Sequence, residues 1–158
     1  MNERLARVHA ILDDVRDPEI PAISITDLGI VRDVRAEGET VVVALTPTYS
    51  GCPATRVIEE DVVRALHERG EGSVRVETRL SPPWSTDWIS VRGRERLREF
   101  GIAPPAATLA DGPAVVAVRC PRCGSFDTHE QSRFGSTPCK ALYRCSACAE
   151  PFDYFKAH

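Results

Sequence analysis

The chain has 158 residues, which suits one ordinary domain or a domain of about 100 residues with a small appendage. Apolar residues make up 42% of it and charged residues 27%, which is typical of a soluble globular protein. No apolar run approaches the roughly 20 residues that a membrane span requires. The net charge is −3, and no dense basic stripe is present, so neither a membrane nor a nucleic acid is an expected partner.

Cysteine usage and the N-terminus indicate a reducing compartment. The start of the chain, Met1–Arg4, lacks the apolar core of a signal peptide, so we expect a cytoplasmic protein. In the cytoplasm, six cysteines are more typical of metal ligands or reactive thiols than of disulfides.

The first hundred residues alternate between helical and strand patterns. Apolar spacing predicts a helix over residues 5–15, with Asn2 as its N-cap and Asp17–Pro21 ending it. Two strands are expected next, over Ile30–Val34 and Thr40–Leu45, with Gly38 between them. They are followed by a helix over Ala54–Arg69 closed by Gly70, a strand over Ser73–Leu80 and a helix over Ser90–Phe100 that stops at Gly101. The order α-β-β-α-β-α predicts an α+β fold, a two-layer α/β sandwich.

A change of composition divides the chain. Residues 103–113 are rich in proline and alanine, which is typical of a linker. A new strand is expected over Val115–Val118, and Phe152–Phe155 is an aromatic-rich strand near the end of the chain. We therefore predict an α/β domain over residues 1–102, a linker over 103–113 and a small β module over 114–158.

The small module carries two Cys-x-x-Cys pairs with 21 residues between them, Cys120/Cys123 and Cys145/Cys148. Four thiolates on two tight turns form a tetrahedral metal site, which predicts a zinc ribbon, although iron also suits four sulfur ligands. Such a closed site is normally structural rather than catalytic. Gly124 follows the first pair where a left-handed backbone is often needed, whereas the second pair has Ala149 in that place.

Two further residues of the module compete as ligands, and its aromatic tail has two interpretations. Cys139 is either a ligand or a small buried apolar residue, and His129 is either a ligand or an exposed loop residue. Tyr154 and Phe155 fit the core of the module, and either of them would mark a partner surface if it were exposed.

A sixth cysteine, Cys52, lies in the loop between a predicted strand and a predicted helix. Because Pro53 suits a first helical position, Cys52 is expected at or next to the N-cap, where the helix dipole favours a thiolate ligand or nucleophile. The alternative is an inert structural cysteine. His67 is about four turns further along the same helix and cannot act as its base.

Three acidic residues, Asp17, Glu19 and Asp27, occur in loops that could share a sheet end with Cys52. They are candidate supporting acids for a site at Cys52. The alternative is a local role, in which they cap turns around the nearby prolines and glycine.

Several motifs resemble known families. Asp17–Pro21, Thr26–Val31 and Ser50–Pro53 resemble the small α/β domain of the iron–sulfur assembly factors that include the SufT proteins. The whole chain resembles one branch, the PaaD (or PaaJ) subunits associated with phenylacetyl-CoA epoxidase, through the segments Thr46–Thr55, Trp84–Trp88, Phe100–Pro105, Phe134–Cys145 and Glu150–Lys156.

The resemblance implies a non-catalytic accessory subunit of the system that epoxidises the ring of phenylacetyl-CoA. Cys52 would be a transient ligand in maturing an iron–sulfur or di-iron centre, with Cys120, Cys123, Cys145 and Cys148 holding a structural zinc. The expected partners are the catalytic or reductase subunits, and a homodimer is possible because one thiolate cannot hold a cluster. A scaffold subunit without cluster transfer is the alternative, and a nucleic-acid-binding ribbon is a weaker one.

Overall fold

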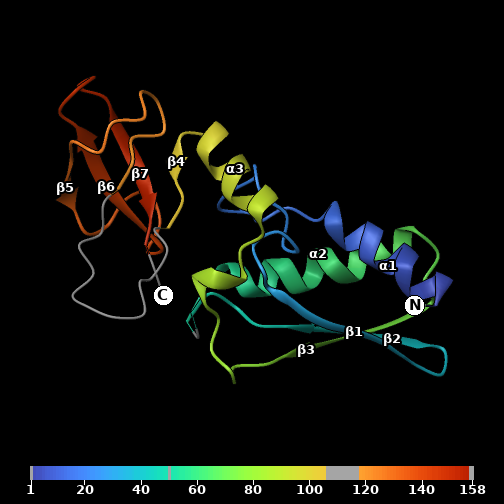
Figure 1. The fold of residues 1–158 in the computed structure, drawn as a ribbon. Helices are drawn as coiled ribbons and strands as arrows, with labels where there is room; N and C mark the ends of the chain where they lie inside the picture. Colours follow the sequence, from blue (N-terminus) through green and yellow to red (C-terminus); the bar gives the residue numbers. More distant parts are fainter. Residues whose placement is uncertain (1, 50, 106–117, 157–158) are drawn as a thin grey trace. The chain divides into compact units, whose positions relative to one another are not determined.

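The computed structural model describes residues 2–49, 51–105 and 118–156 (Figure 1). These residues form two compact units, one within Met1–Gly93 and the other within Arg94–His158. The predicted division at residues 102 and 113 stays a prediction. Most of the predicted linker, and the strand expected over 115–118 except its last residue, lie outside the described residues.

The first unit is a three-stranded sheet with helices α1 and α2 on one face, which confirms the predicted two-layer α/β sandwich (Figure 1). The sheet order is β1-β2-β3, with β1 antiparallel to β2 and β2 parallel to β3. Its elements are α1 (Glu3–Asp13), β1 (Val31–Glu37), β2 (Thr40–Leu45), α2 (Ala54–Glu68), β3 (Ser73–Thr78) and a 3-10 turn η1 (Thr86–Trp88). Helix α3 (Val91–Glu99) begins in this unit and continues into the second.

The helix ends follow the predicted signals. The side chain of Asn2 accepts a hydrogen bond from the amide of Arg4 at 2.9 Å and so caps α1. At the end of α2, Gly70 has φ +97°, and the amide of Glu71 donates to the carbonyl of Leu66 at 3.0 Å. This 6→1 hydrogen bond across a left-handed glycine is a Schellman motif, which explains why α2 stops where glycine appears.

Charged side chains cover the sheet face opposite the helices. Val42 on β2 points to this face, opposite Arg35 of β1 and Arg75 of β3, yet it is fully buried. Arg35 donates to Glu77 at 2.8 Å and Arg75 donates to Glu37 at 2.6 Å, so both pairs cross over the central strand. The stems of these residues shield apolar β2, while the charged groups stay at the surface.

The segment before α3 is fastened to the loop that precedes β1. The indole nitrogen of Trp84 donates to the carbonyl of Leu28 at 2.9 Å. The guanidinium carbon of Arg32, near the start of β1, lies 3.6 Å from the centroid of the Trp88 ring. Gly29 has φ +80°, and a Cβ placed there would lie 2.6 Å from both Cβ and O of Trp88. Glycine is therefore required at this contact for two independent reasons.

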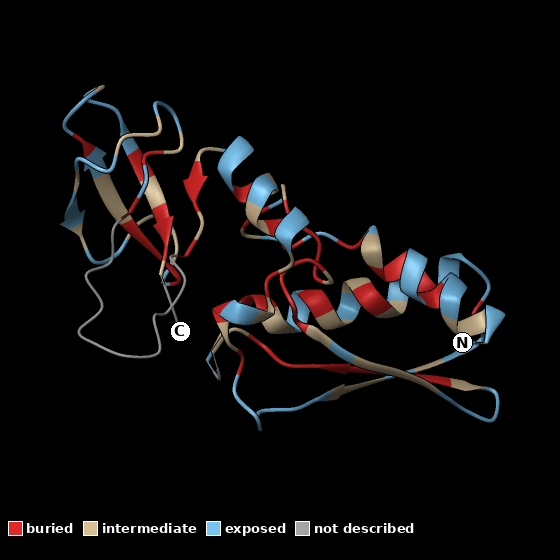
Figure 2. Ribbon diagram, viewed as in Figure 1, coloured by how far each residue is buried: buried red, intermediate tan, exposed pale blue. Residues whose placement is uncertain are grey.

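The second unit holds a four-stranded sheet of order β4-β7-β6-β5. Its strands are β4 (Ile102–Ala103), β5 (Thr128–Ser132), β6 (Lys140–Cys145) and β7 (Pro151–Phe155). β5, β6 and β7 are antiparallel neighbours, and β4 joins β7 in parallel. Tyr154 and Phe155 are buried, at 4% and 1% exposure, so the aromatic strand belongs to the core and does not form a partner surface (Figure 2).

Candidate functional site

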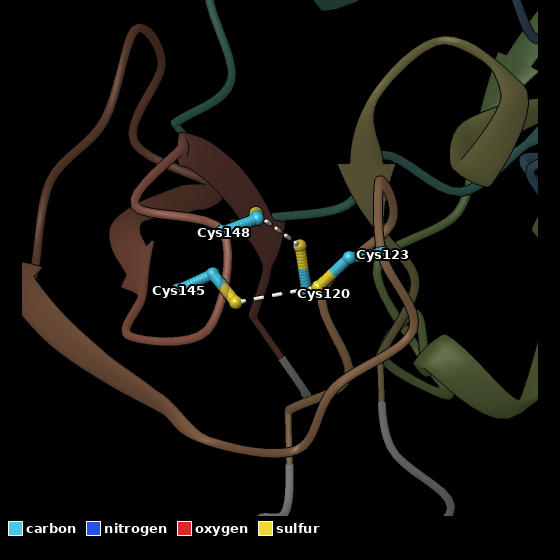
Figure 3. A group of neighbouring side chains, drawn as sticks. All are labelled: Cys120, Cys123, Cys145 and Cys148. Carbon is cyan, nitrogen blue, oxygen red and sulfur yellow. Dashed lines mark hydrogen bonds between the residues drawn. The ribbon is translucent and has the colours of Figure 1, made fainter.

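The four cysteines of the two Cys-x-x-Cys pairs converge in the second unit (Figure 3). All four sulfur atoms lie within 4.8 Å of one another. Across the two turns, the sulfurs of Cys120 and Cys148 are 3.8 Å apart, and those of Cys123 and Cys145 are 3.5 Å apart. Among the described residues, this group alone gathers three or more side chains suited to hold a metal.

Each pair of cysteines lies on a tight turn that ends in a left-handed residue. In the first turn the amide of Gly124 donates to the carbonyl of Cys120 at 3.0 Å, and Gly124 has φ +80°. In the second turn Ala149 takes the equivalent position with φ +63°. The expected difference between these two positions is confirmed, because an alanine occupies a conformation that L-residues adopt only at a cost.

The donor set fits a tetrahedral metal ion. Zinc–sulfur bonds of about 2.3 Å at tetrahedral angles place sulfurs roughly 3.8 Å apart, close to the two distances between the turns. Cys120 and Cys145 are buried, Cys148 is half-buried and Cys123 is exposed. A four-sulfur set leaves no open coordination position, so a metal held here would be structural.

The thiols of this group have divergent proton affinities. The amide of Cys148 donates to the sulfur of Cys145 and lowers the pKa of Cys145 to about 7. The amide of Glu150 likewise favours the thiolate of Cys148, but burial and the three neighbouring thiols outweigh it and raise the pKa of Cys148 to about 12. Four ionised sulfurs this close repel one another, so their joint ionisation requires a bound cation.

The two competing ligand candidates have other neighbours. The sulfur of Cys139, which is buried, lies 3.0 Å from the hydroxyl of Thr137. His129 is exposed, with its Nδ1 3.4 Å from the hydroxyl of Ser146. Neither belongs to the group of four sulfurs.

Cys52 lies directly before α2 in the first unit. Pro53 is the N-cap rather than the first helical residue and makes no side-chain capping bond, so Cys52 lies next to the N-cap, within the predicted range. The amide of Cys52 donates to the carbonyl of Tyr49, and its carbonyl accepts from the amide of Thr55, both at 3.2 Å. The backbone of Cys52 is thus fixed in consecutive turns, while its side chain is half-exposed.

Two of the three candidate acids hold structural contacts, Asp17 within its own turn and Asp27 with residues at the start of α3. Asp17 accepts hydrogen bonds from the amides of Glu19 and Ile20, both at 2.8 Å. Asp27, only 3% exposed, accepts from Ser90 at 2.8 Å and pairs with Arg92 at 2.9 Å.

Asp17 also lines a cavity of about 380 Å³ against the second half of α2. The α2 residues in this cavity begin at Asp61, roughly 10 Å along the helix from its start beside Cys52. A supporting role for Asp17, Glu19 and Asp27 at Cys52 stays a prediction.

Sequence reasoning missed two groups of interacting residues. The first joins the Asp27–Gly29 triplet to the Trp84–Trp88 segment, about sixty residues further on. The second lies in the second unit, where Lys140 is buried and its Nζ is 3.9 Å from Asp153. Both groups lie in the family motifs named above, but a single sequence does not show which motif contacts which.

Among the residues that the structure describes, no helix combines the length and apolar character that a membrane crossing needs.

The fold and the sulfur group together define a two-part protein, an α/β domain followed by a four-cysteine β ribbon. Two family profiles match the same parts: "Iron-sulfur cluster assembly protein" over residues 5–78 and "PaaD zinc beta ribbon domain" over residues 104–156. The domain of unknown function DUF59 from Bacillus anthracis, solved by crystallography, is 32% identical with a TM-score of 0.54, and the match covers 58% of this chain and 89% of that one.

Two curated relatives extend the comparison. A protein of Escherichia coli K12, named as the putative D-type subunit of 1,2-phenylacetyl-CoA epoxidase, is 52% identical over 149 residues, covering 94% of this chain and 90% of the relative. An "Fe-S protein maturation auxiliary factor" of Porphyromonas gingivalis is 36% identical over 58% of this chain and 85% of its own length. The chain therefore belongs to the PaaD family, that of the D-type subunits of phenylacetyl-CoA epoxidase.

Proposed function

We propose that the chain is a non-catalytic accessory subunit of the phenylacetyl-CoA epoxidase system in phenylacetate degradation. In this proposal it assists the maturation of an iron–sulfur or di-iron centre through Cys52, and the ribbon carries a structural zinc. The likeness to the D-type epoxidase subunit and to iron–sulfur maturation factors supports the general assignment. A cytoplasmic location belongs to the same proposal, because thiols stay reduced there.

The division of the cysteines carries the proposal. In the second unit, four sulfur atoms lie within 4.8 Å of one another and would form a closed metal site. Cys52 lies in the first unit, the part that matches the iron–sulfur assembly family, and its side chain is half-exposed. A half-exposed thiol at a helix start can bind and release a metal cargo, whereas a closed four-sulfur site cannot exchange readily.

A cluster is the cargo in this scheme, and its transfer is a ligand exchange. The iron–sulfur bond to Cys52 breaks as a bond from iron to a client cysteine forms, and the client thiol's proton passes to the released Cys52 thiolate. No electron changes hands. Because iron–sulfur clusters commonly need four protein ligands, Cys52 would share the cluster with a second copy of the chain or with the client.

Zinc is the proposed resident ion of the ribbon. Four thiolates in a closed tetrahedron are the usual structural zinc site, and the matching family profile is described as a zinc ribbon. The ion would fix the two turns to each other and add to the small apolar core of this unit.

A scaffold subunit that binds the oxygenase or reductase without cluster transfer is the second candidate function. The match of residues 104–156 to a zinc beta ribbon favours it, because a closed four-sulfur site can fix the fold of such a module without exchanging its ion. The two functions differ in one residue: cluster transfer requires the thiol of Cys52, and scaffolding does not.

The discriminating experiment replaces Cys52 with Ser in cells that grow on phenylacetate. We expect the iron content and activity of the epoxidase system to fall at least tenfold, with zinc content and co-purification unchanged. Cys139→Ser is the matched control, since Cys139 is also a cysteine outside the zinc group. Full epoxidase activity with Cys52→Ser would remove cluster transfer and leave the scaffold function.

A further inference from the structure

Phe134 is a large apolar side chain held at the surface of the second unit. Its side chain is 68% exposed and lies in the loop between β5 and β6. Isolated exposed apolar residues are common and need no explanation by themselves. The contacts that hold this one in place are what distinguish it.

The loop beside Phe134 is fastened to β7 through Asp153. A Cβ on Gly135 would lie 2.6 Å from Oδ1 of Asp153, so a larger residue there would displace this carboxylate. Ser136 donates to Oδ2 of the same carboxylate at 3.3 Å, and the amide of Gly135 donates to the carbonyl of Lys140 at 2.7 Å. The loop next to Phe134 is therefore held by two hydrogen bonds and by the close approach of Gly135 to Asp153, and none of these buries the phenyl ring.

A cation is also held on that ring. Nζ of Lys156 lies 4.6 Å from the centroid of the Phe134 ring and donates to the carbonyl of Arg133 at 2.9 Å. The amide of Lys156 in turn donates to the carbonyl of Cys139 at 3.0 Å. Both ends of Lys156 are thus fixed, and an ammonium group is presented beside an exposed aromatic face.

Phe126 provides an internal comparison. It is 63% exposed and lies under Arg119, but the guanidinium carbon is 5.9 Å from the ring centroid. That distance is at the limit of an effective cation–π contact. Phe126 is also followed directly by the acidic Asp127, whereas Phe134 is preceded by Arg133.

We infer that Phe134 and Lys156 form a docking anchor for a protein partner whose surface offers an apolar pocket with an acidic rim. Aromatic residues in preorganised positions are the usual energetic centres of interfaces. Lys156 holds an ammonium group against the ring and Arg133 precedes Phe134 in the chain, while the carboxylate of Asp153 is engaged by Ser136 and Lys140. The local charge is therefore positive, and an acidic rim complements it.

Identification of the partner as an epoxidase subunit rests on the proposed function. The test measures the binding of the full chain to each purified subunit of the phenylacetyl-CoA epoxidase system by calorimetry at several salt concentrations. Phe134→Ala should weaken the complex at least tenfold, and Phe126→Ala should leave it unchanged. Lys156→Gln should weaken it about threefold to tenfold and flatten its salt dependence, with Lys156→Arg restoring most of the affinity.

The outcomes separate the anchor from the function. Equal binding by wild type and Phe134→Ala, with zinc content intact in both, would overturn the anchor and leave the proposed function standing. Equal losses from Phe126→Ala and Phe134→Ala would also overturn it. If the wild-type chain binds none of the subunits, the proposed function fails, and the anchor fails with it.

Discussion

The two units of this protein are stabilised in different ways. The first has a continuous apolar core beneath two helices, with fully buried residues such as Val8, Leu12, Val43 and Leu66. The core cluster of the second contains Ala103, Val118, Cys120, Ala141, Cys145, Phe152 and Tyr154, so two of its members are also metal ligands. We therefore expect the first unit to fold by burying apolar surface and the second to depend on a bound ion, so that the two stabilities are separable.

Loss of a zinc ligand should have the largest effect. Cys145→Ser removes a fully buried ligand, and structural zinc contributes on the order of 10 kcal/mol to such modules. We expect the second unit to unfold and the first to stay folded. Both tryptophans, Trp84 and Trp88, lie in the first unit, so tryptophan fluorescence reports on that unit alone, and a zinc-binding dye reports on the second.

A strong chelator should reproduce this result with the wild-type chain. Cys139→Ser is the control, and it should retain the ion. Simultaneous loss of the tryptophan signal and of zinc would show that the units are not separable.

Acidification should have the next largest effect, and it should destabilise the second unit at a higher pH than the first. Each thiolate ligand must take up a proton to release the ion, so zinc affinity should fall by up to roughly four powers of ten per pH unit below the ordinary thiol pKa of about 8.5. In the first unit, Arg75 lowers the pKa of Glu37 and Arg35 lowers the pKa of Glu77 below the ordinary value of 4.5.

Because those two carboxylates have lowered pKa values, their stabilisation is complete above pH 4.5 and is lost only as the pH falls through the lowered values. A pH titration should therefore show zinc release before the tryptophan transition. A tryptophan transition that came before zinc release would show that the first unit is the more acid-sensitive of the two.

Gly29→Ala should be the most damaging of the glycine substitutions in the first unit. The new Cβ would lie 2.6 Å from Trp88 in a left-handed conformation, and strain plus overpacking predict a loss of about 2–5 kcal/mol. Gly38→Ala is matched, because Gly38 has φ +61° and nothing within 4 Å of the added Cβ. Urea unfolding followed by tryptophan fluorescence should show a much smaller loss for Gly38→Ala, and equal losses would disprove the contact.

Ala149→Gly should have a small effect of opposite sign. Relief of the left-handed alanine in the second cysteine turn should stabilise the second unit by about 1 kcal/mol. Zinc release during chelator titration should slow, while the urea midpoint of the first unit stays unchanged. Faster release would mean that Ala149 is not strained.

Local signals in the sequence were sufficient for the elements of the first unit. Asn2, Gly38 and Gly70 each mark a helix end or a turn where the structure has one, because caps and left-handed positions depend on residues close in the chain. The four candidate metal ligands could also be predicted from the sequence, because the spacing of a Cys-x-x-Cys turn already places its two sulfur atoms side by side.

Interactions between distant segments could not be predicted in the same way. The contact of Gly29 with Trp88 and the contact of Asp153 with the loop at Gly135 join residues far apart in sequence. Nothing in either local pattern specifies its counterpart. The exposed position of Phe134 depends on such contacts. The sequence pattern therefore did not predict it and indicated Tyr154 and Phe155 as the candidates for a partner surface.

We expect Cys52 and the ribbon cysteines to serve different metals. Zinc and iron analysis of the full chain, purified with and without air, tests this division directly when Cys52→Ser is measured beside wild type. The expected result is one zinc per chain in every sample and iron only in wild type purified without air. Iron that persists in Cys52→Ser, or zinc that disappears from it, would show that the two sets of cysteines do not serve separate metals.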